Sequence, residues 1–272
     1  MTSLLLIMIF SLLQPTESIK AISYNIRYNN PNDGMNIWEN RRVTVSIFLN
    51  EENADFIGLQ EVVKPQLLYL VGALKTYTFI GVGREDGKTK GEYSPIFYKK
   101  QKYKLLKSNT FWLSETPQIV SKGWDASLER ICTYGLFQNK KTGDKVWVFN
   151  THFDHRGTLA RAKSVDLIIE KVKALNQEGL PTIITGDFNL TPFTQPIQKM
   201  QSNFDDVQKN LPQSDPYYGT SNGFDTEKNA KQRIDYIFIK NLQAKNAKHI
   251  YKKTPMGGWA SDHHPVIAIL DN

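Results

Sequence analysis

Four strand-like segments follow one another between Gly91 and Phe153 without an intervening helix, and this run constrains the fold more than any other feature. The segments are GEYSPIFYKK, YKLLKSNTFWLSE, RICTYGLFQNK and KVWVFNTHF, and the turn sequence KTGD separates the last two. Parallel strands need long crossover connections that are usually helices, so strands joined this directly are antiparallel. A purely parallel, doubly wound sheet therefore fits the chain badly.

Helical patterns and further strands surround this run. Helices are predicted over residues 36–52, 64–74 and 159–179, and the last one ends at a glycine. Further strands are predicted over residues 20–27, 54–61, 181–189, 233–240, 243–253 and 263–270. Because strands outnumber helices, the architecture that buries all of these faces is an α/β sandwich, in which two packed sheets are covered by helices.

The first 18 residues differ from the rest of the chain. SLLLIMIFSLL (residues 3–13) is too short to span a bilayer comfortably, but long enough for the core of a signal peptide. Small residues, Thr16 and Ser18, precede a cleavage point after Ser18. No Lys or Arg lies ahead of the run, which leaves a buried N-terminal element as the alternative. We predict a signal peptide over residues 1–18, a single domain over residues 19–272, and a secreted or periplasmic location.

Charge and cysteine content narrow the choice of function only modestly. The formal net charge is +7, and it rises to +8 without the leader, whose one charged residue is Glu17. A basic excess suits an anionic partner, such as a phosphoester, a nucleic acid or a membrane surface. The single cysteine, Cys132, excludes an intrachain disulfide and a cysteine-rich metal site, and its apolar strand predicts a core residue.

Polar residues recur at the ends of the predicted strands. They are Asn25, Glu61, His152, Asp187, Asn189, Asp262 and His263. Taken singly, each is as readily a turn residue, a helix cap or an edge charge. Strand ends of a rigid sheet, however, can hold converging side chains in place. Five strand ends that carry such residues together indicate a functional site.

The motifs SYNIR, LQE, GDFN, IDYIF and SDHHPV occur in this order, and with them the chain from Asn25 to Val266 resembles the endonuclease/exonuclease/phosphatase superfamily. This superfamily includes DNase I-like nucleases, abasic-site endonucleases, deadenylases, inositol polyphosphate 5-phosphatases and neutral sphingomyelinases. The resemblance implies a four-layered, DNase I-like α/β sandwich and metal-dependent hydrolysis of phosphate esters.

Cleavage of a phosphate ester needs neutralised phosphate oxygens, an aligned water and a stabilised leaving group. Carboxylate and amide oxygens suit Mg²⁺, with Mn²⁺ and Ca²⁺ as alternatives. Glu61 is the best direct ligand and Asn25 lies near it, which the resemblance also implies; Asp262 is predicted to join them directly or through water. Asp187 is predicted to activate the water, because Asn189 cannot accept a proton near neutral pH. Asn189 would hold the water or a phosphate oxygen.

Two histidines are predicted to bind the phosphoryl oxygens. Either His152 or His263 would be able to donate a proton if its second ring nitrogen is held in place. The resemblance implies that Asp235 orients His263, and a shorter match implies that Glu92 orients His152.

Four further residues are predicted to contact the substrate, and for Tyr98 the resemblance implies a contact with phosphate. They are Tyr98, Arg130, Asn150 and Asp154. A core aromatic is the alternative for Tyr98, and a surface salt bridge is the alternative for Arg130. Asn150 would bind either the substrate or a metal-bound water, and Asp154 would line the mouth of the site.

Two other kinds of protein compete with this prediction. THFDH (residues 151–155) is part of a register that resembles the HxHxDH zinc motif of metallo-β-lactamase-like hydrolases. Asn150 stands at its first position, however, which leaves the motif one ligand short. His155 is therefore predicted to be a loop residue or a contact at the substrate rim. A non-catalytic binding module would be expected to lack some central positions, and all of them are present.

The fold and the motifs leave the substrate open, because one fold serves many phosphoesters. A secreted phosphodiesterase or nuclease is the first choice, and nucleic acid is then a candidate partner. A lipid or inositol phosphate phosphatase is the second choice. No stable protein partner is inferred, and a monomer is predicted.

Overall fold

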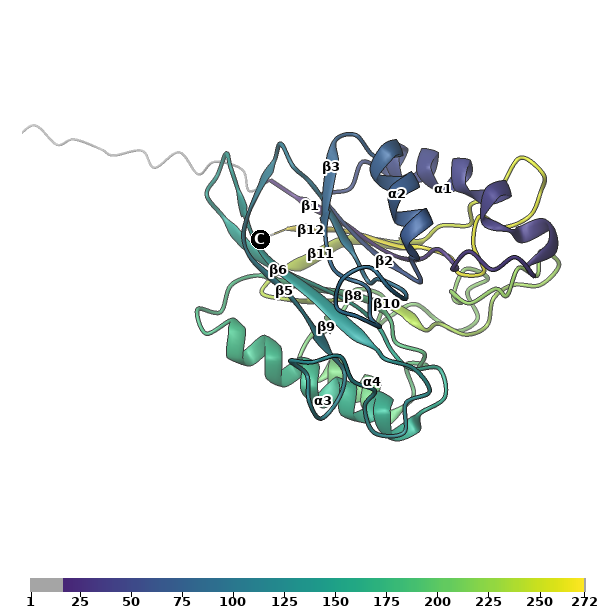
Figure 1. Cartoon of the computed structure of the whole chain (residues 1–272). Coiled ribbons are helices and arrows are strands. Elements are labelled where there is room, and N and C mark those ends of the chain that lie inside the picture. Colours follow the sequence, from purple (N-terminus) through teal and green to yellow (C-terminus); the bar gives the residue numbers. More distant parts are fainter. Residues whose placement is uncertain (1–16, 272) are drawn as a thin grey trace, which may run out of the picture.

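Two six-stranded sheets form the centre of the molecule and pack face to face (Figure 1). The computed structural model describes residues 17–271. The first sheet has the order β11-β12-β1-β2-β4-β3, with bounds Gln243–His249, Val266–Asp271, Ile19–Asn25, Phe56–Gln60, Ile96–Lys99 and Tyr77–Ile80. The second sheet has the order β5-β6-β7-β8-β10-β9, with bounds Tyr103–Trp112, Ile131–Asn139, Lys145–His152, Thr182–Asp187, Asp235–Lys240 and Asp205–Asp206.

Each sheet contains one parallel pair within an otherwise antiparallel arrangement. β1 runs parallel to β2, and β7 runs parallel to β8. Each of these pairs needs a crossover connection, which is supplied by α1 (Trp38–Glu52) in the first sheet and α3 (Thr158–Leu175) in the second. These two mixed sheets confirm the predicted α/β sandwich.

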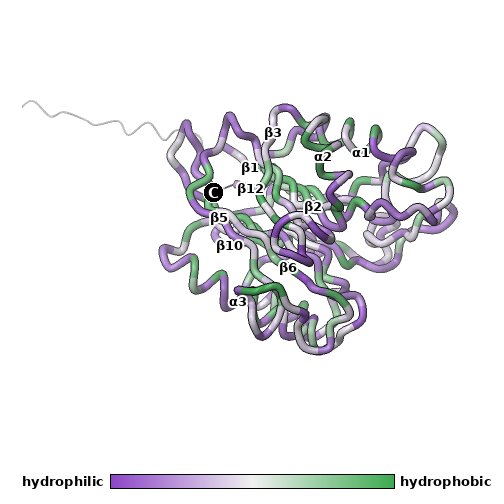
Figure 2. The backbone as a smooth tube through the Cα atoms, in the orientation of Figure 1, coloured by the Kyte–Doolittle hydropathy of each residue, from purple (hydrophilic) through white to green (hydrophobic). Residues whose placement is uncertain are grey.

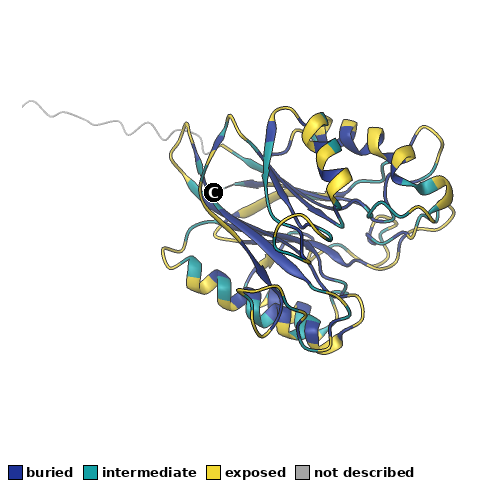
Figure 3. Ribbon diagram, in the orientation of Figure 1, coloured by how far each residue is buried: buried dark blue, intermediate teal, exposed yellow. Residues whose placement is uncertain are grey.

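The helices form the outer layers of the sandwich. A 3₁₀ turn (η1, Gly34–Asn36), α1 and α2 (Lys64–Ala73) lie over the first sheet, and α3 and α4 (Gln195–Gln201) lie over the second (Figure 1). Their outward faces are exposed and the strands between them are buried (Figure 3). The chain therefore has four layers.

Three clusters of buried apolar side chains separate these layers. One joins α1 and α2 to the first sheet, and another joins α3 and α4 to the second sheet. The third lies between the two sheets and draws residues such as Phe56, Phe137 and Ile183 from both of them. Apolar stretches accordingly follow the central strands in Figure 2. Burial of this apolar surface is the main force that holds the layers together.

The run of four predicted strands does not stay in one sheet. Its first strand, β4, pairs with β2 and β3, whereas β5, β6 and β7 belong to the second sheet. The chain changes sheets at the short turn between Lys99 and Tyr103. The sequence pattern does not predict β3, β9 or α4, because these elements are too short to show a clear hydrophobic period.

Most of the predicted leader, residues 1–16, lies outside the described residues. Glu17 contacts Lys102 and Asn139, and β1 begins at Ile19, just after the predicted cleavage point. Within residues 17–271, no helix combines the length and the apolar character that crossing a membrane requires.

Candidate active site

Strand ends from both sheets meet at one edge of the sandwich, around a cleft of about 440 Å³. Because β1 is parallel to β2 and β7 is parallel to β8, these four strands end at this edge, and β10, antiparallel to β8, begins there. The cleft is lined by Arg27, Tyr28, Glu61, Glu92, Leu128, Arg130, His152, His155, Asp187, Asn189, Asp262 and His263. The structure thus brings eight of the thirteen predicted site residues to the surface of one cleft.

The backbone at this edge adopts an uncommon conformation. Arg27, Glu61 and Asn189 follow β1, β2 and β8, and their φ angles are 58°, 61° and 50°. Positive φ is unfavourable for residues with a side chain, although asparagine tolerates it better than most. Such strain persists only where the surroundings enforce it, and it clusters at functional sites. At these three positions the positive φ lets the backbone turn away from the strand while the side chain still lines the cleft.

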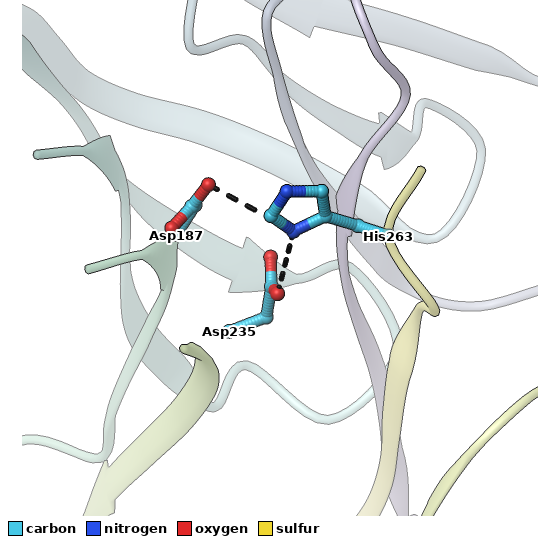
Figure 4. A group of neighbouring side chains, drawn as sticks. All are labelled: Asp187, Asp235 and His263. Carbon is cyan, nitrogen blue, oxygen red and sulfur yellow. Dashed lines mark hydrogen bonds and ion pairs between the residues drawn. The ribbon is translucent and has the colours of Figure 1, made fainter. Parts of the chain in front are cut away.

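His263 faces two carboxylates with the same side of its ring (Figure 4). Its Nδ1 is 2.8 Å from Asp235 Oδ2 and 3.9 Å from Asp187 Oδ2, and all three residues are buried. Burial alone would lower the pKa of His263, but the charges of Asp235 and Asp187 outweigh it and raise that pKa well above its ordinary value. His263 is therefore protonated at neutral pH, and the predicted His263–Asp235 contact is present.

His152, unlike His263, is uncharged at neutral pH. Burial, followed by the positive charges of Arg130 and Arg84, holds the pKa of His152 well below its ordinary value. Its Nε2 is 3.2 Å from Asn189 Nδ2 and 3.5 Å from Asp187 Oδ2. A neutral ring can accept a hydrogen bond from the Asn189 amide. Neutral His152 and protonated His263 therefore both approach Asp187 Oδ2.

Asp187 is the carboxylate that both histidines approach. Burial, followed by the charge of Asp235, raises the pKa of Asp187 to about 7. Its Oδ1 accepts a hydrogen bond from the Asn189 N–H at 2.9 Å, and its Oδ2 accepts one from the Asn25 amide at 3.0 Å. A carboxylate with this pKa can take up a proton near neutral pH, which an ordinary aspartate does poorly.

Asn25 links two carboxylates, and its predicted role as a metal ligand stays a prediction. Its Nδ2 donates to Glu61 Oε1 at 3.1 Å as well as to Asp187, and its Oδ1 accepts from the Arg27 N–H. The amide oxygen, the atom that a metal would need, keeps a second lone pair beside the one that accepts from the Arg27 N–H. In this geometry Asn25 orients Glu61 and Asp187.

Glu61 and Asp262 both offer carboxylate oxygens to the cleft. Both line the cleft, and the Arg27 guanidinium lies 4.0 Å from Glu61 Oε2 and 3.7 Å from Asp262 Oδ2. Burial, together with the charge of Glu61, raises the pKa of Asp262. Carboxylate oxygens are the ligands that Mg²⁺ prefers, whereas the Arg27 guanidinium offsets part of their negative charge.

Another group also has donor atoms close enough to hold an ion. Asp187, Asp235 and His263 place one donor atom each within 4.8 Å of one another. In this group, however, His263 Nδ1 already contacts Asp235, and the pKa of His263 is raised. A protonated ring has no lone pair for a metal. Glu61 and Asp262 stay the predicted ligands of a cation.

Glu92 lines the cleft but does not hold His152 by a hydrogen bond. Its Oε2 is 3.8 Å from His152 Nδ1, whereas the same oxygen accepts a hydrogen bond from Arg84 at 2.7 Å. His152 Nδ1 has no hydrogen-bond partner among the described residues. The two groups thus approach each other without a hydrogen bond, because Arg84 is nearer to the carboxylate, and the orienting role of Glu92 stays a prediction.

Arg130 and Asp154 form a buried ion pair next to the cleft. Arg130 lines the cleft, its Nε is 3.4 Å from Asp154 Oδ2, and one of its Nη atoms is 3.0 Å from His155 Nδ1. Asp154 also accepts hydrogen bonds from the backbone N–H groups of Arg156 and Gly157. Burial opposes ionisation of Asp154, but these N–H groups hold its pKa below the ordinary value. Asp154 therefore positions Arg130, and its predicted place at the mouth of the site is wrong.

Asn150 does not face the cleft, so its predicted contact with substrate is wrong. Its Nδ2 donates to the carbonyl oxygens of Leu59 and Pro95, and its Oδ1 accepts from Gln60 and Thr185. All of its hydrogen-bonding groups are thus used to join the two sheets. Gly58 faces this bridge, and a Cβ there would lie 2.0 Å from Thr185 Oγ1 and 2.6 Å from Asn150 Oδ1.

Tyr98 also lies away from the cleft, so its predicted contact with phosphate is wrong. It pairs with Phe56 at the start of β2, whereas Glu61 follows the end of that strand. Its ring packs 4.8 Å from that of Phe137 in the cluster between the sheets. The core alternative for Tyr98 is the correct one.

THFDH does not form a zinc site. Among residues 17–271, the group of histidine and acidic residues whose donor atoms lie close enough for a metal contains neither His152, Asp154 nor His155. His155 lines the cleft, as predicted for a rim contact. Arg27 and Arg84 are absent from the predicted site. Arg27 lies within the motif SYNIR, which was the available signal, whereas the loop of Arg84 resembles solvated surface in sequence.

Comparisons with known proteins agree with this fold. The Endonuclease/Exonuclease/phosphatase family model matches residues 22–263. A structure of an endonuclease/exonuclease/phosphatase family protein from Bacteroides thetaiotaomicron is 36% identical, with a TM-score of 0.87, over 94% of this chain and 98% of that one. A mannosyl-6-phosphatase from the same organism is 36% identical, with a TM-score of 0.87, over 93% of this chain and 100% of that one.

An uncharacterised protein of Acanthamoeba polyphaga mimivirus is 31% identical over 161 residues, which are 56% of this chain and 59% of the viral protein. The chain therefore matches only about three fifths of this curated relative. The family match, by contrast, spans nearly the whole described chain and includes the strand ends around the cleft. The chain is a hydrolase that belongs to the Endonuclease/Exonuclease/phosphatase family.

Proposed function

We propose that this protein is a Mg²⁺-dependent phosphatase that removes a terminal phosphate from a phosphorylated sugar. The observation that carries the proposal is the gathering of Arg27, Arg130 and protonated His263 in one cleft beside Asp187. A phosphate monoester carries more negative charge than a diester, and it presents three terminal oxygens to such donors. The mannosyl-6-phosphatase, which matches the chain over almost its whole length, supports a sugar phosphate as the substrate class.

Asp187 takes the proton of the attacking water. Its raised pKa allows this near neutral pH, and the Asn189 and Asn25 N–H groups fix the direction of its carboxylate. As the bond from phosphorus to the sugar oxygen breaks, His263 donates a proton to the departing oxygen, with Asp235 holding the ring. Neutral His152 is positioned by Asn189 to contact the phosphoryl group. Mg²⁺, held by Glu61 and Asp262, would neutralise charge on the phosphate.

Paired substrates test the choice between monoester and diester. The purified protein should hydrolyse p-nitrophenyl phosphate and sugar 6-phosphates faster than bis(p-nitrophenyl) phosphate, DNA, RNA or phosphoinositides. EDTA or the change Asp187→Ala should abolish the activity, whereas Asp144→Ala, an exposed aspartate on the β6–β7 turn, should not. Preference for a diester or a nucleic acid would refute the proposal and favour a nuclease or phosphodiesterase.

We also propose that the protein is exported and acts as a monomer. The support for export is the apolar run at residues 3–13 and the start of β1 at Ile19, next to the predicted cleavage point. N-terminal sequencing of the protein from fractionated cells should give a mature chain that begins at Ile19. An intact N-terminus on cytoplasmic protein would contradict export, and a dimer by light scattering would contradict the monomer.

A further inference from the structure

A second hollow, of about 530 Å³, lies beside the loop that follows β8. Its lining includes Pro192 and Phe193 from the loop after β8, Gln198 and Gln201 from α4, and Asn210 and Gln213 from the segment after β9. The mechanism uses none of these residues. Phe193 is the prominent one, because 62% of its surface is exposed although its side chain is a large apolar ring.

The hollow is close to the reacting groups. Pro192 is three residues from Asn189, and Arg233, which lines the floor, is two residues before Asp235. Extended chain spans at most about 3.6 Å per residue, so these walls begin within about 11 Å of the active-site residues. The cleft and the hollow share no lining residue, but this spacing is short enough for a ligand of several sugar rings to extend from one to the other.

The walls of the hollow are held rigidly. The Tyr236 hydroxyl lies 2.7 Å from the Leu190 carbonyl oxygen and 3.0 Å from that of Arg233, so it ties the loop to the strand. The Arg233 guanidinium is buried and pairs with both oxygens of Asp206, the closer one at 2.8 Å. The hollow is therefore formed before a ligand arrives, which reduces the entropy lost on binding.

The chemistry of the lining suits a neutral ligand that is rich in hydroxyl groups. Amide side chains both donate and accept hydrogen bonds, and a hydroxyl needs this pairing. An exposed aromatic ring offers a flat apolar surface for the C–H face of a sugar ring. No carboxylate is found among the described residues that line the hollow, and Asp206 neutralises Arg233.

A nucleic acid strand would fit this lining less well. Proteins follow a phosphate backbone with a succession of positive side chains beside the stacking rings. Of the two cations in the lining, Arg233 is paired and buried, so Lys209 is left as the accessible one. One lysine does not form such a track.

We propose that this hollow is a subsite for the carbohydrate part of the substrate, and that a sugar ring stacks on Phe193. The inference rests on the proposed function, since the phosphate occupies the cleft while the sugars extend into the hollow. The phosphatase would then prefer a phosphate at the end of an oligosaccharide to the phosphate of a single sugar.

Kinetics of the Phe193→Ala variant test the subsite. For a phosphorylated oligosaccharide, KM should rise about tenfold with little change in kcat, as expected for loss of one aromatic stacking contact. For p-nitrophenyl phosphate, both constants should stay at the wild-type values. Ile119→Ala is the matched control, because Ile119 is also 62% exposed and does not line the hollow. An unchanged KM for the oligosaccharide would overturn the subsite.

A binding assay separates the subsite from the reaction. Unphosphorylated oligosaccharides should bind the Asp187→Ala protein in calorimetry, and the added change Phe193→Ala should abolish that binding. If the wild type hydrolyses p-nitrophenyl phosphate but no oligosaccharide binds, the subsite is wrong and the phosphatase stands. If oligosaccharides bind but no monoester is hydrolysed, the proposed function is wrong. Binding of single-stranded DNA at this hollow in place of sugars would also overturn the subsite.

Discussion

Replacing Asp235 with asparagine would remove the charge that keeps His263 protonated while leaving the shape of the side chain almost unchanged. The two side chains are buried and 2.8 Å apart, and Asp235 is the strongest influence that raises the pKa of His263. In the variant, burial would no longer be opposed by this charge. The pKa of His263 should therefore fall, and less of the imidazolium should be present at neutral pH.

The size of the effect follows from the type of contact. A hydrogen bond that involves a charged group contributes about 1.5–3 kcal/mol. If the transition state loses the whole of this stabilising free energy, kcat/KM should fall by about 10- to 150-fold, since 1.36 kcal/mol corresponds to a factor of ten. The protonated ring is the active form, so the alkaline limb of the pH profile should also move to lower pH.

Two measurements check this prediction together. The pH dependence of kcat/KM with p-nitrophenyl phosphate locates the alkaline limb, and NMR titration of the imidazole reports the pKa of His263 directly. Asp55→Asn is a suitable control, because Asp55 is also buried, and it pairs with Lys102 at 3.0 Å. A lowered kcat/KM with an unmoved alkaline limb would refute the role of His263 as the proton donor.

Further changes test the packing between the sheets, the stability in acid and the predicted metal site. Gly58→Ala should lower the free energy of unfolding by about 1–3 kcal/mol in urea titration, because the new methyl group meets the polar bridge between the sheets. Gly72→Ala, in a helix with open space around it, should be neutral or stabilising, and equal losses for both variants would contradict the packing argument. Burial lowers the pKa of His264 to about 3, so protonation below pH 6.5 should destabilise the fold by up to about 1.4 kcal/mol per pH unit. His264→Phe should make this acid dependence shallower, and an unchanged slope would show that another group is responsible. Glu61→Gln should raise the Mg²⁺ concentration needed for half-maximal activity, and an identical titration would remove Glu61 from the ligand set.

The sequence determines the class of fold and most of the site residues. Strand alternation and the direct turns between residues 91 and 153 predict antiparallel strands in a sandwich, and two mixed sheets are found. Polar residues that end apolar strands predict Glu61, His152, Asp187 and His263, and these do share one cleft. Such residues are identifiable because a change from buried apolar to polar side chains along one strand is a local property of the chain.

Position along and between strands is decided by the tertiary structure. Asn150 and His152 point to the same side of β7, yet Asn150 is buried between the sheets while His152 reaches the cleft. Tyr98 is misplaced for a related reason, since its antiparallel pairing with Phe56 puts it at the far end of β2 from the cleft. Neither depth nor register is visible in the alternation of one strand, because both are set by the packing of the partner strands and sheets.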